Sequence, residues 1–554
     1  MSPSATRRIR LRPTAVAAIL TASLLSVLNL ACPGRPADGG PADAPAANQT
    51  ALPAGTLVFA RGGDSVGLDP GHEDDGESIK VAESIFDTLS EFKPGTTEIQ
   101  PGLATSWDVT PDGLTYTFHL RQGVTFHDGT PFDADAVLFS LLRQHDPAHP
   151  AHGIGGAWKY WGGMGMSEII ASIQKTDAAT VIIKLTRPEA PFLANLAMPF
   201  CSIVSPTAVM KLGDRFGHEP VGTGPFKLAS WQQEQKIVLE AFDGYWGGRP
   251  KLDRVIFEVV KDKNVRALRF KSGEIHAFDD PGPTELQAVR DVPGVKILEA
   301  PGMNVGYLAM NTMHEPFDDP RVRIAVNHAV NKQRIVDDIF KGTGQVAKNP
   351  LPPTLWGYNS DVKDFAHDPA QAKALLAEAG FPAGFKTTLW YMPVARPYMP
   401  DGKKVAESIQ MDLAEVGITA DLVTYDWATY LDRVNNGDHD MALLGWSGDN
   451  GDPDNFLYNL LSIQAASQKP TQNIAFYRNA EFNRLITDAK RVTDQPTRAD
   501  LYRKAQVVFH DDPPWACLAH NLQVVVTQGS VNGWILYPNT RHDFRSVTIS
   551  QAAQ

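Results

Sequence analysis

One stretch of the chain, residues 386–446, alternates between strand and helix patterns and constrains the fold more than any other. Three of its segments have the composition of strands, at 386–392, 418–425 and 441–446. Two segments between them are expected to be helices, at 403–416 and around 427–434. Strands that alternate with helices predict a parallel sheet joined by right-handed crossovers, and hence an α/β fold.

Two of these strands end in polar loops, at 393–398 and 447–455. Ligands of parallel sheets bind outside the carboxyl ends of the strands, so both loops are expected at one edge. This edge would bring the cation of Arg396 and the anion of Asp449 to the same space. Prolines stiffen the first loop, and Gly448 lets the backbone of the second approach a ligand closely.

Such a pair of charges suits a zwitterion. The ammonium and carboxylate of a dipeptide lie roughly 5–7 Å apart, at ~3.3–3.6 Å per extended residue. Arg396 can hold a carboxylate by two parallel hydrogen bonds, and Asp449 can accept from an ammonium. The spacing alone equally allows two solvated loops, or an ion pair between these two residues. Asp452 and Asp454 are expected in turns and caps, because the twelve-residue calcium-loop pattern is incomplete.

Length, charge and motifs exclude several classes of protein. The chain has 554 residues, and a single core rarely grows past about 250–300, so two or more lobes are expected. A net charge of -12 argues against nucleic-acid binding. The adjacent pairs His127-Asp128 and His439-Asp440 come without a nucleophile elbow or a His-Glu-x-x-His helix, so a peptidase is disfavoured. No metal site or cofactor is predicted.

The N-terminus has the layout of an export signal. Four arginines precede residue 13, and an uncharged apolar stretch follows at 15–31. A small residue before Cys32 predicts lipidation there, although Asn29 stands where an aliphatic residue is usual, and ordinary cleavage is the alternative. Residues 33–54 have almost no large apolar side chain, and 32–54 are expected to be a disordered tether.

The two remaining cysteines, Cys201 and Cys517, leave two alternatives open. An oxidising compartment would allow one disulfide between them. Each nevertheless lies in an apolar stretch, which favours two buried thiols.

Several further motifs give a resemblance to a known family. They include YTFHLRQGVTFHDGTPFDADAVLFS at 116–140, GTGPFKL at 222–228 and AFDGYWGG at 241–248. With these, the chain resembles the peptide-binding proteins of bacterial ABC importers, an extracellular solute-binding family of peptide and nickel binders. The likeness to its dipeptide-binding branch is carried by RPEAPFLANLAM, MNVGYL, MPVARPY and GWSGDNGDPDNF, at 187–198, 303–308, 392–398 and 445–456.

The resemblance implies a two-lobed periplasmic-binding-protein-like fold, with a hinge and an inserted domain. The expected parts are an export signal (1–31), a tether (32–54), a first lobe (55–88, 223–305 and 516–554), an inserted domain (89–222) and a second lobe (306–515). It further implies a periplasmic, non-enzymatic monomer, anchored to the membrane only through a lipid on Cys32. Its expected partners are a dipeptide or short peptide, an inner-membrane permease and the ATPase subunits.

The resemblance also assigns roles to individual residues. Arg396 would hold the ligand's carboxylate and Asp449 its amino group, with Tyr398 and Gly448 beside them. Trp427 would form a wall of the side-chain pocket, or else be a core aromatic. Two features depart from the family: Ala60 stands where a disulfide cysteine is usual, and residues 71–78 match poorly. A nickel or haem binder on the same fold is the remaining alternative.

Overall fold

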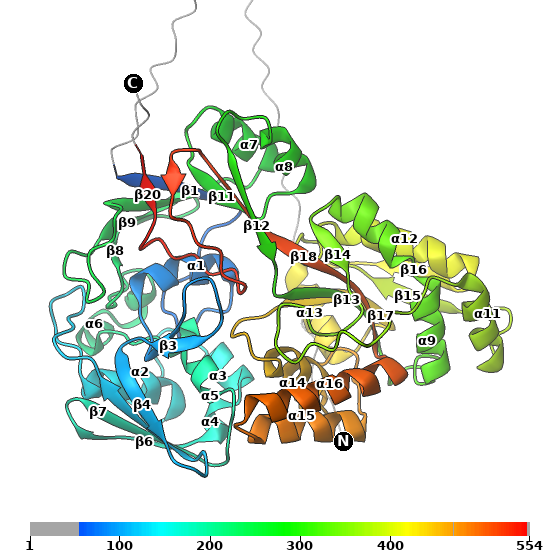
Figure 1. The fold of residues 1–554 in the computed structure, drawn as a ribbon, viewed down its shortest axis with the longest axis horizontal. Coiled ribbons are helices and arrows are strands. Elements are labelled where there is room, and N and C mark those ends of the chain that lie inside the picture. The colour runs from blue at the N-terminus through cyan, green and yellow to red at the C-terminus, as the bar shows by residue number, and fades with distance from the viewer. Residues whose placement is uncertain (1–54, 469, 551–554) are drawn as a thin grey trace, which may run out of the picture. The chain divides into compact units, whose positions relative to one another are not determined.

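The computed structural model describes residues 55–468 and 470–550, all within one unit (Figure 1). The predicted export signal, the tether and Cys32 lie outside the described residues. Within the described ranges, none of the helices combines the length and the apolarity needed to cross a membrane.

A sheet of twelve strands runs through both expected lobes. Ten of its strands follow in the order β16 (Thr419–Val423), β15 (Lys386–Trp390), β17 (Met441–Ser447), β13 (Asn304–Met310), β18 (Trp515–Thr527), β11 (Ala277–Asp279), β1 (Thr56–Arg61), β10 (Arg254–Val259), β9 (Lys236–Ala241) and β8 (Phe226–Gln232). The other two, β12 (Lys296–Pro301) and β14 (Gly344–Val346), both pair with β18.

Strand β18 is shared between the two halves of this sheet. Its first residues pair with β13 and β14, and its last residues pair with β11 and β12. The short link between β12 and β13 crosses between the halves at the same place. The two halves are therefore joined by the length of β18 and by this link, which fits the hinge that the resemblance implies.

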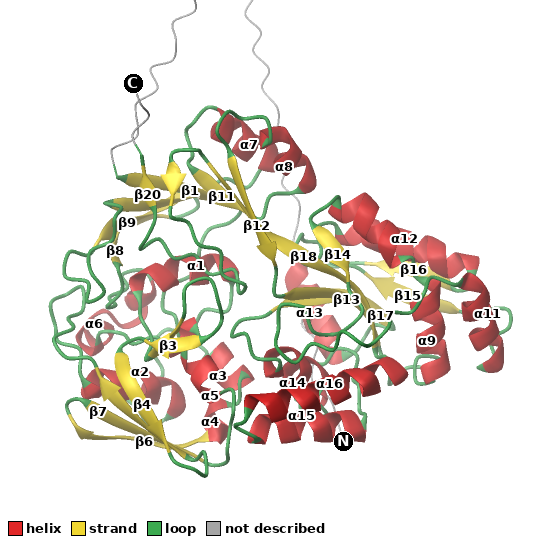
Figure 2. Ribbon diagram, viewed as in Figure 1, coloured by secondary structure: helices red, strands yellow, loops and turns green. Residues whose placement is uncertain are grey.

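The parallel sheet predicted over 386–446 is confirmed. Strand β15 pairs in parallel with β16 and with β17, the latter with Leu389 opposite Met441. The crossovers are α12 (Gly402–Glu415) and α13 (Trp427–Asn436), close to the predicted bounds. Helices surround the strands of this half (Figure 2). The others are α9 (Pro320–Ala329), α10 (Lys332–Ile335), α11 (Pro369–Glu378), α14 (Asp454–Leu461), α15 (Ala480–Arg491) and α16 (Gln495–Asp511).

The segment 89–222 has a sheet and a core of its own. The sheet has the order β4 (Ala104–Val109), β5 (Thr115–Leu120), β7 (Thr180–Leu185) and β6 (Ile170–Asp177). Short strands β2 (Ser90–Phe92) and β3 (Ile99–Pro101) and helices α2 (Ala134–His145), α3 (Lys159–Gly163), α4 (Met166–Ile169) and α5 (Phe192–Leu196) accompany it. Its buried core draws on residues between Leu89 and Ile203. The α/β fold with an additional domain is thus present.

The first lobe packs around the β1 half of the large sheet. Its helices are α1 (Gly76–Ile85), α7 (Lys263–Lys271) and α8 (Pro283–Val289), and β19 (Val531–Asn532) pairs with β20 (Thr548–Ile549). Helix α6 (Pro206–Leu212) falls within the expected inserted domain, yet Val209 packs in the core of the first lobe. The domain boundaries therefore stay predictions, and this packing favours an earlier end for the inserted domain.

The two cysteines of the described chain are separate. Cys201 packs in the core of the inserted segment and Cys517 in the core of the second lobe, and both are buried free thiols. Burial raises the pKa of Cys517 to about 12, which keeps the thiol protonated. Of the two alternatives, the structure has the buried thiols.

Candidate ligand-binding site

The two polar loops lie at the same edge of the sheet, as the parallel pairing requires. The first follows β15 and the second follows β17. The first loop folds back over the sheet, and its Tyr398 packs on a pair of glycines. Gly306 of β13 and Gly445 of β17 face each other in register, and a Cβ on either would overlap Tyr398. This cross-strand glycine pair was a signal in the sequence that the prediction did not use.

Arg396 sits at the tip of a closed turn. Its backbone N–H donates to the carbonyl of Met399 (3.0 Å), and the Met399 N–H donates back to the Arg396 carbonyl (2.9 Å). The Arg396 side chain is exposed, and its guanidinium carbon lies 5.0 Å from the centroid of the Trp427 ring. Asn521 of β18 steadies the turn by donating to the Pro397 carbonyl (2.7 Å). The cation is thus held in place by neutral partners.

Trp427 is the first residue of α13, which Asp426 caps by accepting from the Thr429 N–H. The indole is half-buried and stacks on Tyr430, with 5.8 Å between ring centroids and 13° between planes. One side of Trp427 therefore packs against the core while the ring also supports Arg396. The core contact fits the reading of Trp427 as a core aromatic, and its role as a wall of the side-chain pocket stays a prediction.

Asp449 is half-buried and receives hydrogen bonds from three parts of the chain. Tyr160 of α3 and Asn455 of α14 each donate to its carboxylate at 3.4 Å. Asn539, which follows β19, donates to its main-chain carbonyl at 3.0 Å. Burial raises the pKa of Asp449 to about 7, and the hydrogen bonds from Asn455 and Tyr160 offset only part of this rise. The sequence prediction missed Tyr160 and Asn539, which lie far away along the chain.

The described residues offer neither charge an opposite partner. Arg396 and Asp449 do not pair with each other, and within 55–468 and 470–550 neither makes an ion pair within 4.0 Å. The alternative of a mutual salt bridge is therefore not realised. A buried carboxylate without a counter-charge is costly unless a cation from outside completes it.

The other acids of the second loop have structural partners. Asp452 accepts from the Asp454 N–H (3.0 Å), as expected for a turn, and forms a two-pronged ion pair with Arg498 of α16 (both 2.8 Å). Asp454 lies 3.4 Å from the ammonium of Lys490. No group of three or more His, Cys, Asp or Glu side chains that could hold a metal occurs in the described ranges. The loop is thus anchored by the ion pairs of Asp452 and Asp454, whereas Asp449 takes no part in an ion pair with the described residues.

Gly448 is fixed by packing. Its N–H donates to the Met303 carbonyl (2.7 Å), and a Cβ there would overlap the ring of Phe456. Tyr398 is buried and hydrogen-bonded to Arg396, and burial raises its pKa to about 12. Both predicted residues therefore shape the loops that carry the two charges.

The histidines considered for hydrolysis are bound to the main chain. His127 contacts the Gly224 carbonyl (3.0 Å) and His439 the Ile474 carbonyl (2.9 Å). Burial lowers the pKa of each to about 4, so both are neutral. Neither is among the partners of Asp449 or Arg396.

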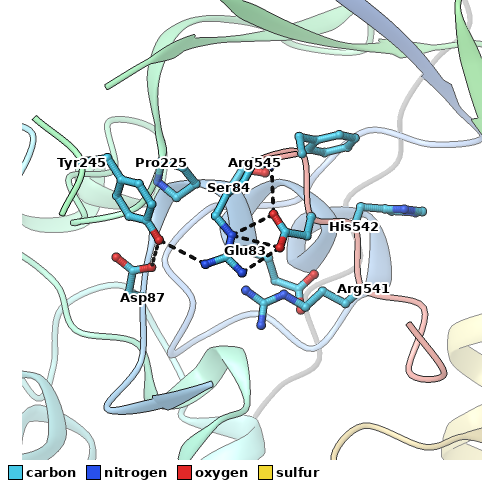
Figure 3. Close-up of a pocket in the computed structure, with 10 residues that line it drawn as sticks. Glu83, Ser84, Asp87, Pro225, Tyr245, Arg541, His542 and Arg545 are labelled. Carbon is cyan, nitrogen blue, oxygen red and sulfur yellow. Dashed lines mark hydrogen bonds and ion pairs between the residues drawn. The ribbon is translucent and has the colours of Figure 1, made fainter. Parts of the chain in front are cut away.

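A small enclosed pocket lies elsewhere, in the first lobe (Figure 3). Its volume is about 10 Å³, which is room for roughly one water molecule. Its walls include Tyr245, Arg545 and Asp543, of which the last two pair at 2.7 Å. A pocket of this size cannot admit a peptide.

The lobes, the hinge strand and an edge with two unpaired charges define a class of protein, the two-lobed solute-binding proteins of ABC importers. The model of the bacterial extracellular solute-binding proteins, family 5, matches residues 98–468, and the chain belongs to this family. It is therefore an extracytoplasmic substrate-binding protein that serves an ABC transporter, and not an enzyme.

Individual relatives agree with this assignment. The dipeptide-binding protein of Escherichia coli (strain K12) is 43% identical over 507 residues, covering 89% of this chain and 94% of that one. Heme-binding protein A of Haemophilus influenzae is 40% identical, covering 89% and 92%. The Helicobacter pylori periplasmic binding protein DppA, solved with the peptide STSA, has a TM-score of 0.81 at 43% identity and covers 90% and 98%.

The packing of the Tyr398 ring on Gly445 gives the first testable prediction. Gly445→Ala should displace the Tyr398 ring and destabilise the protein by about 1–3 kcal/mol, because overpacking forces neighbours to shift. Gly62→Ala is the matched control, since a Cβ there meets no atom within 4 Å. Urea unfolding followed by circular dichroism measures both. Equal unfolding midpoints for the two variants would contradict the packing described above.

Proposed function

We propose that this protein captures dipeptides, or other short peptides, by their two charged ends and delivers them to the membrane permease of an ABC importer. One observation carries the proposal. Arg396 and Asp449 sit on loops at one sheet edge, and neither has an opposite charge among the described residues. Relatives that are named for dipeptides or were solved with a peptide support the same ligand class.

Each end of the ligand would complete a prepared subsite. The ammonium would take the counter-charge position at Asp449, where Tyr160 and Asn455 already orient the carboxylate. The carboxylate would receive the two parallel N–H groups of Arg396, whose plane Trp427 supports. Side chains of the peptide would occupy the space beside Trp427. Because Tyr160 of the inserted segment also contacts Asp449, a ligand held there would favour the closed state, which the permease would recognise.

The haem-binding relative gives a specific reason for a second candidate, haem on the same scaffold. Haem iron is held by His, Cys, Met or Tyr side chains. Of these, Tyr160, Tyr398, Met303 and Met399 lie at the site. Both tyrosines already bond to a charged neighbour, and both methionines are buried. Titration with haemin, followed by its Soret absorption, decides between the two. Haem binding that survives loss of Arg396 and Asp449, without any peptide binding, would favour the second candidate.

Removing either charge should abolish tight peptide binding. Arg396→Ala and Asp449→Asn should each weaken the affinity by tens- to thousands-fold, or about 2–5 kcal/mol, because the partner charge on the ligand is left unpaired. Calorimetric titration of ligand-free residues 55–554 with dipeptides, tripeptides and amino acids measures this. Arg484→Ala, in an exposed ion pair with Glu481, is the control and should bind like wild type. A folded wild type that binds no peptide would refute the proposal.

The affinity should also depend on pH. In the arrangement of this structure, with no ligand at its carboxylate, Asp449 has a pKa of about 7, and a bound ammonium would lower it, so the complex would hold fewer protons. Affinity should therefore fall as pH drops below about 7, by up to about tenfold per unit, and level off above it. The same titrations between pH 5 and 7.5 test this, with Asp449→Asn as the flat control. A wild-type affinity that does not change over this range would contradict an ionised Asp449 in the complex.

We further propose that the protein is a monomer, tethered to the membrane through a lipid on Cys32. The support is the small residue before Cys32 and the apolar-poor segment 33–54 after it. Mass spectrometry of the full-length protein from membranes should show a mature N-terminus at Cys32 with added acyl mass. An unmodified N-terminus, or one at another residue, would refute the anchor.

A further inference from the structure

The loop at 447–455, called here the Asp449 loop, contacts the inserted segment at several points. Asn450 donates to the side-chain oxygen of Asn195 at 2.7 Å, and both residues are buried. Thr97 packs on Gly451, whose φ is +71°, so that no side chain fits there. With the hydrogen bond from Tyr160 to Asp449, these contacts join the inserted segment to three consecutive residues of the Asp449 loop.

A buried charge cluster lies behind the same loop. The ammonium of Lys490, on α15, is 2.9 Å from Glu189 and 3.4 Å from Asp454. It also lies 3.8 Å from the centroid of the Tyr458 ring. Glu189 is 1% exposed and Asp454 2%, so both carboxylates are removed from water. Beside them the Lys490 carbonyl accepts from the Ala190 N–H at 2.8 Å, which adds a main-chain contact to the ion pair.

This cluster joins two parts of the chain that have separate cores. Glu189 precedes α5 in the inserted segment, whereas α15 packs in the core of the second lobe (Figure 1). Along the chain, the inserted segment lies between β1 and β8 of the first lobe. The chain enters the second lobe by the link from β12 to β13 and leaves it along β18. Movement of the second lobe about those connections would therefore separate Glu189 from Lys490.

We propose that Glu189 and Lys490 form a closure latch, which holds the Asp449 loop against the inserted segment when ligand is bound. The inference rests on the proposed function and adds two positioning residues to it. Because the contact belongs to the closed state, it contributes to affinity without touching the ligand. Its loss should raise the dissociation rate and leave the association rate nearly unchanged.

The cluster offers a variant that should still fold. Glu189 also lies 3.7 Å from the guanidinium of Arg187, whose side chain is exposed to solvent. Glu189→Gln therefore keeps the shape, leaves Asp454 to balance Lys490, and leaves Arg187 hydrated. Replacing a charged hydrogen bond by a neutral one should weaken binding of the probe alanyl-leucine about tenfold. Glu481→Gln, on the exposed face of α15 and in an ion pair with Arg484, is the matched control and should change nothing.

Stopped-flow binding rates and ligand-free thermal unfolding are measured on the same variants. The latch predicts a faster dissociation for Glu189→Gln and an unchanged midpoint of the ligand-free protein. If Glu189→Gln releases the peptide at the same rate as the wild type, the latch is overturned. A midpoint that falls together with the affinity would also overturn it, because the pair would then belong to the permanent fold.

A cross-linking experiment tests the latch independently of the proposed function. If wild type binds no dipeptide, the function fails, and the latch is judged by cross-linking alone. Glu189→Cys combined with Lys490→Cys should be joined by a short bismaleimide without ligand, since closed molecules are sampled. Glu189→Cys with Arg484→Cys, on the opposite face of α15, should not be joined. Absence of the first cross-link would overturn the latch.

Discussion

The parallel pairing of β15 with β17 is the constraint on which the rest of the site depends. Only when two neighbouring strands run in the same direction do the loops that follow them leave at the same edge. Here that edge receives Arg396 from one loop and Asp449 from the other. Strand β13 runs antiparallel beside β17 and supplies Gly306, opposite Gly445, so that the first loop can fold down onto the sheet.

Three aspartates within one loop show how the protein separates structure from binding. Asp452 is balanced by Arg498 and Asp454 by Lys490, both from helices of the same lobe. Asp449 has only neutral partners at its carboxylate, and burial raises its pKa more than their hydrogen bonds lower it. The paired acids fix the loop, which reduces the entropy lost on binding. The unpaired acid is the one that a cation from outside can neutralise.

Features that depend on nearby residues could be predicted from the sequence, and features that depend on distant ones could not. The parallel strands and the helices α12 and α13 follow from local pattern and composition. The partners of Asp449 come from elsewhere, since Tyr160 is 289 residues away and Asn539 is 90 residues away. Arg396 and Asp449 could be predicted as one site because the parallel strands before them end at the same edge of the sheet. Glu189 and Lys490 had no such link, because no sheet connects their two elements.

Burial of Asp449 also couples charge recognition to closure. In this structure its carboxylate lies between Tyr160 of the inserted segment and Asn455 of the second lobe, while Asn539 donates to its main-chain carbonyl. Without a ligand this arrangement carries the desolvation cost of an unpaired anion, which favours an open molecule. A bound ammonium removes that cost, so the energy that recognises the ligand is also the energy that closes the lobes. A neutral ligand of the same shape would leave the cost in place and would close the protein poorly.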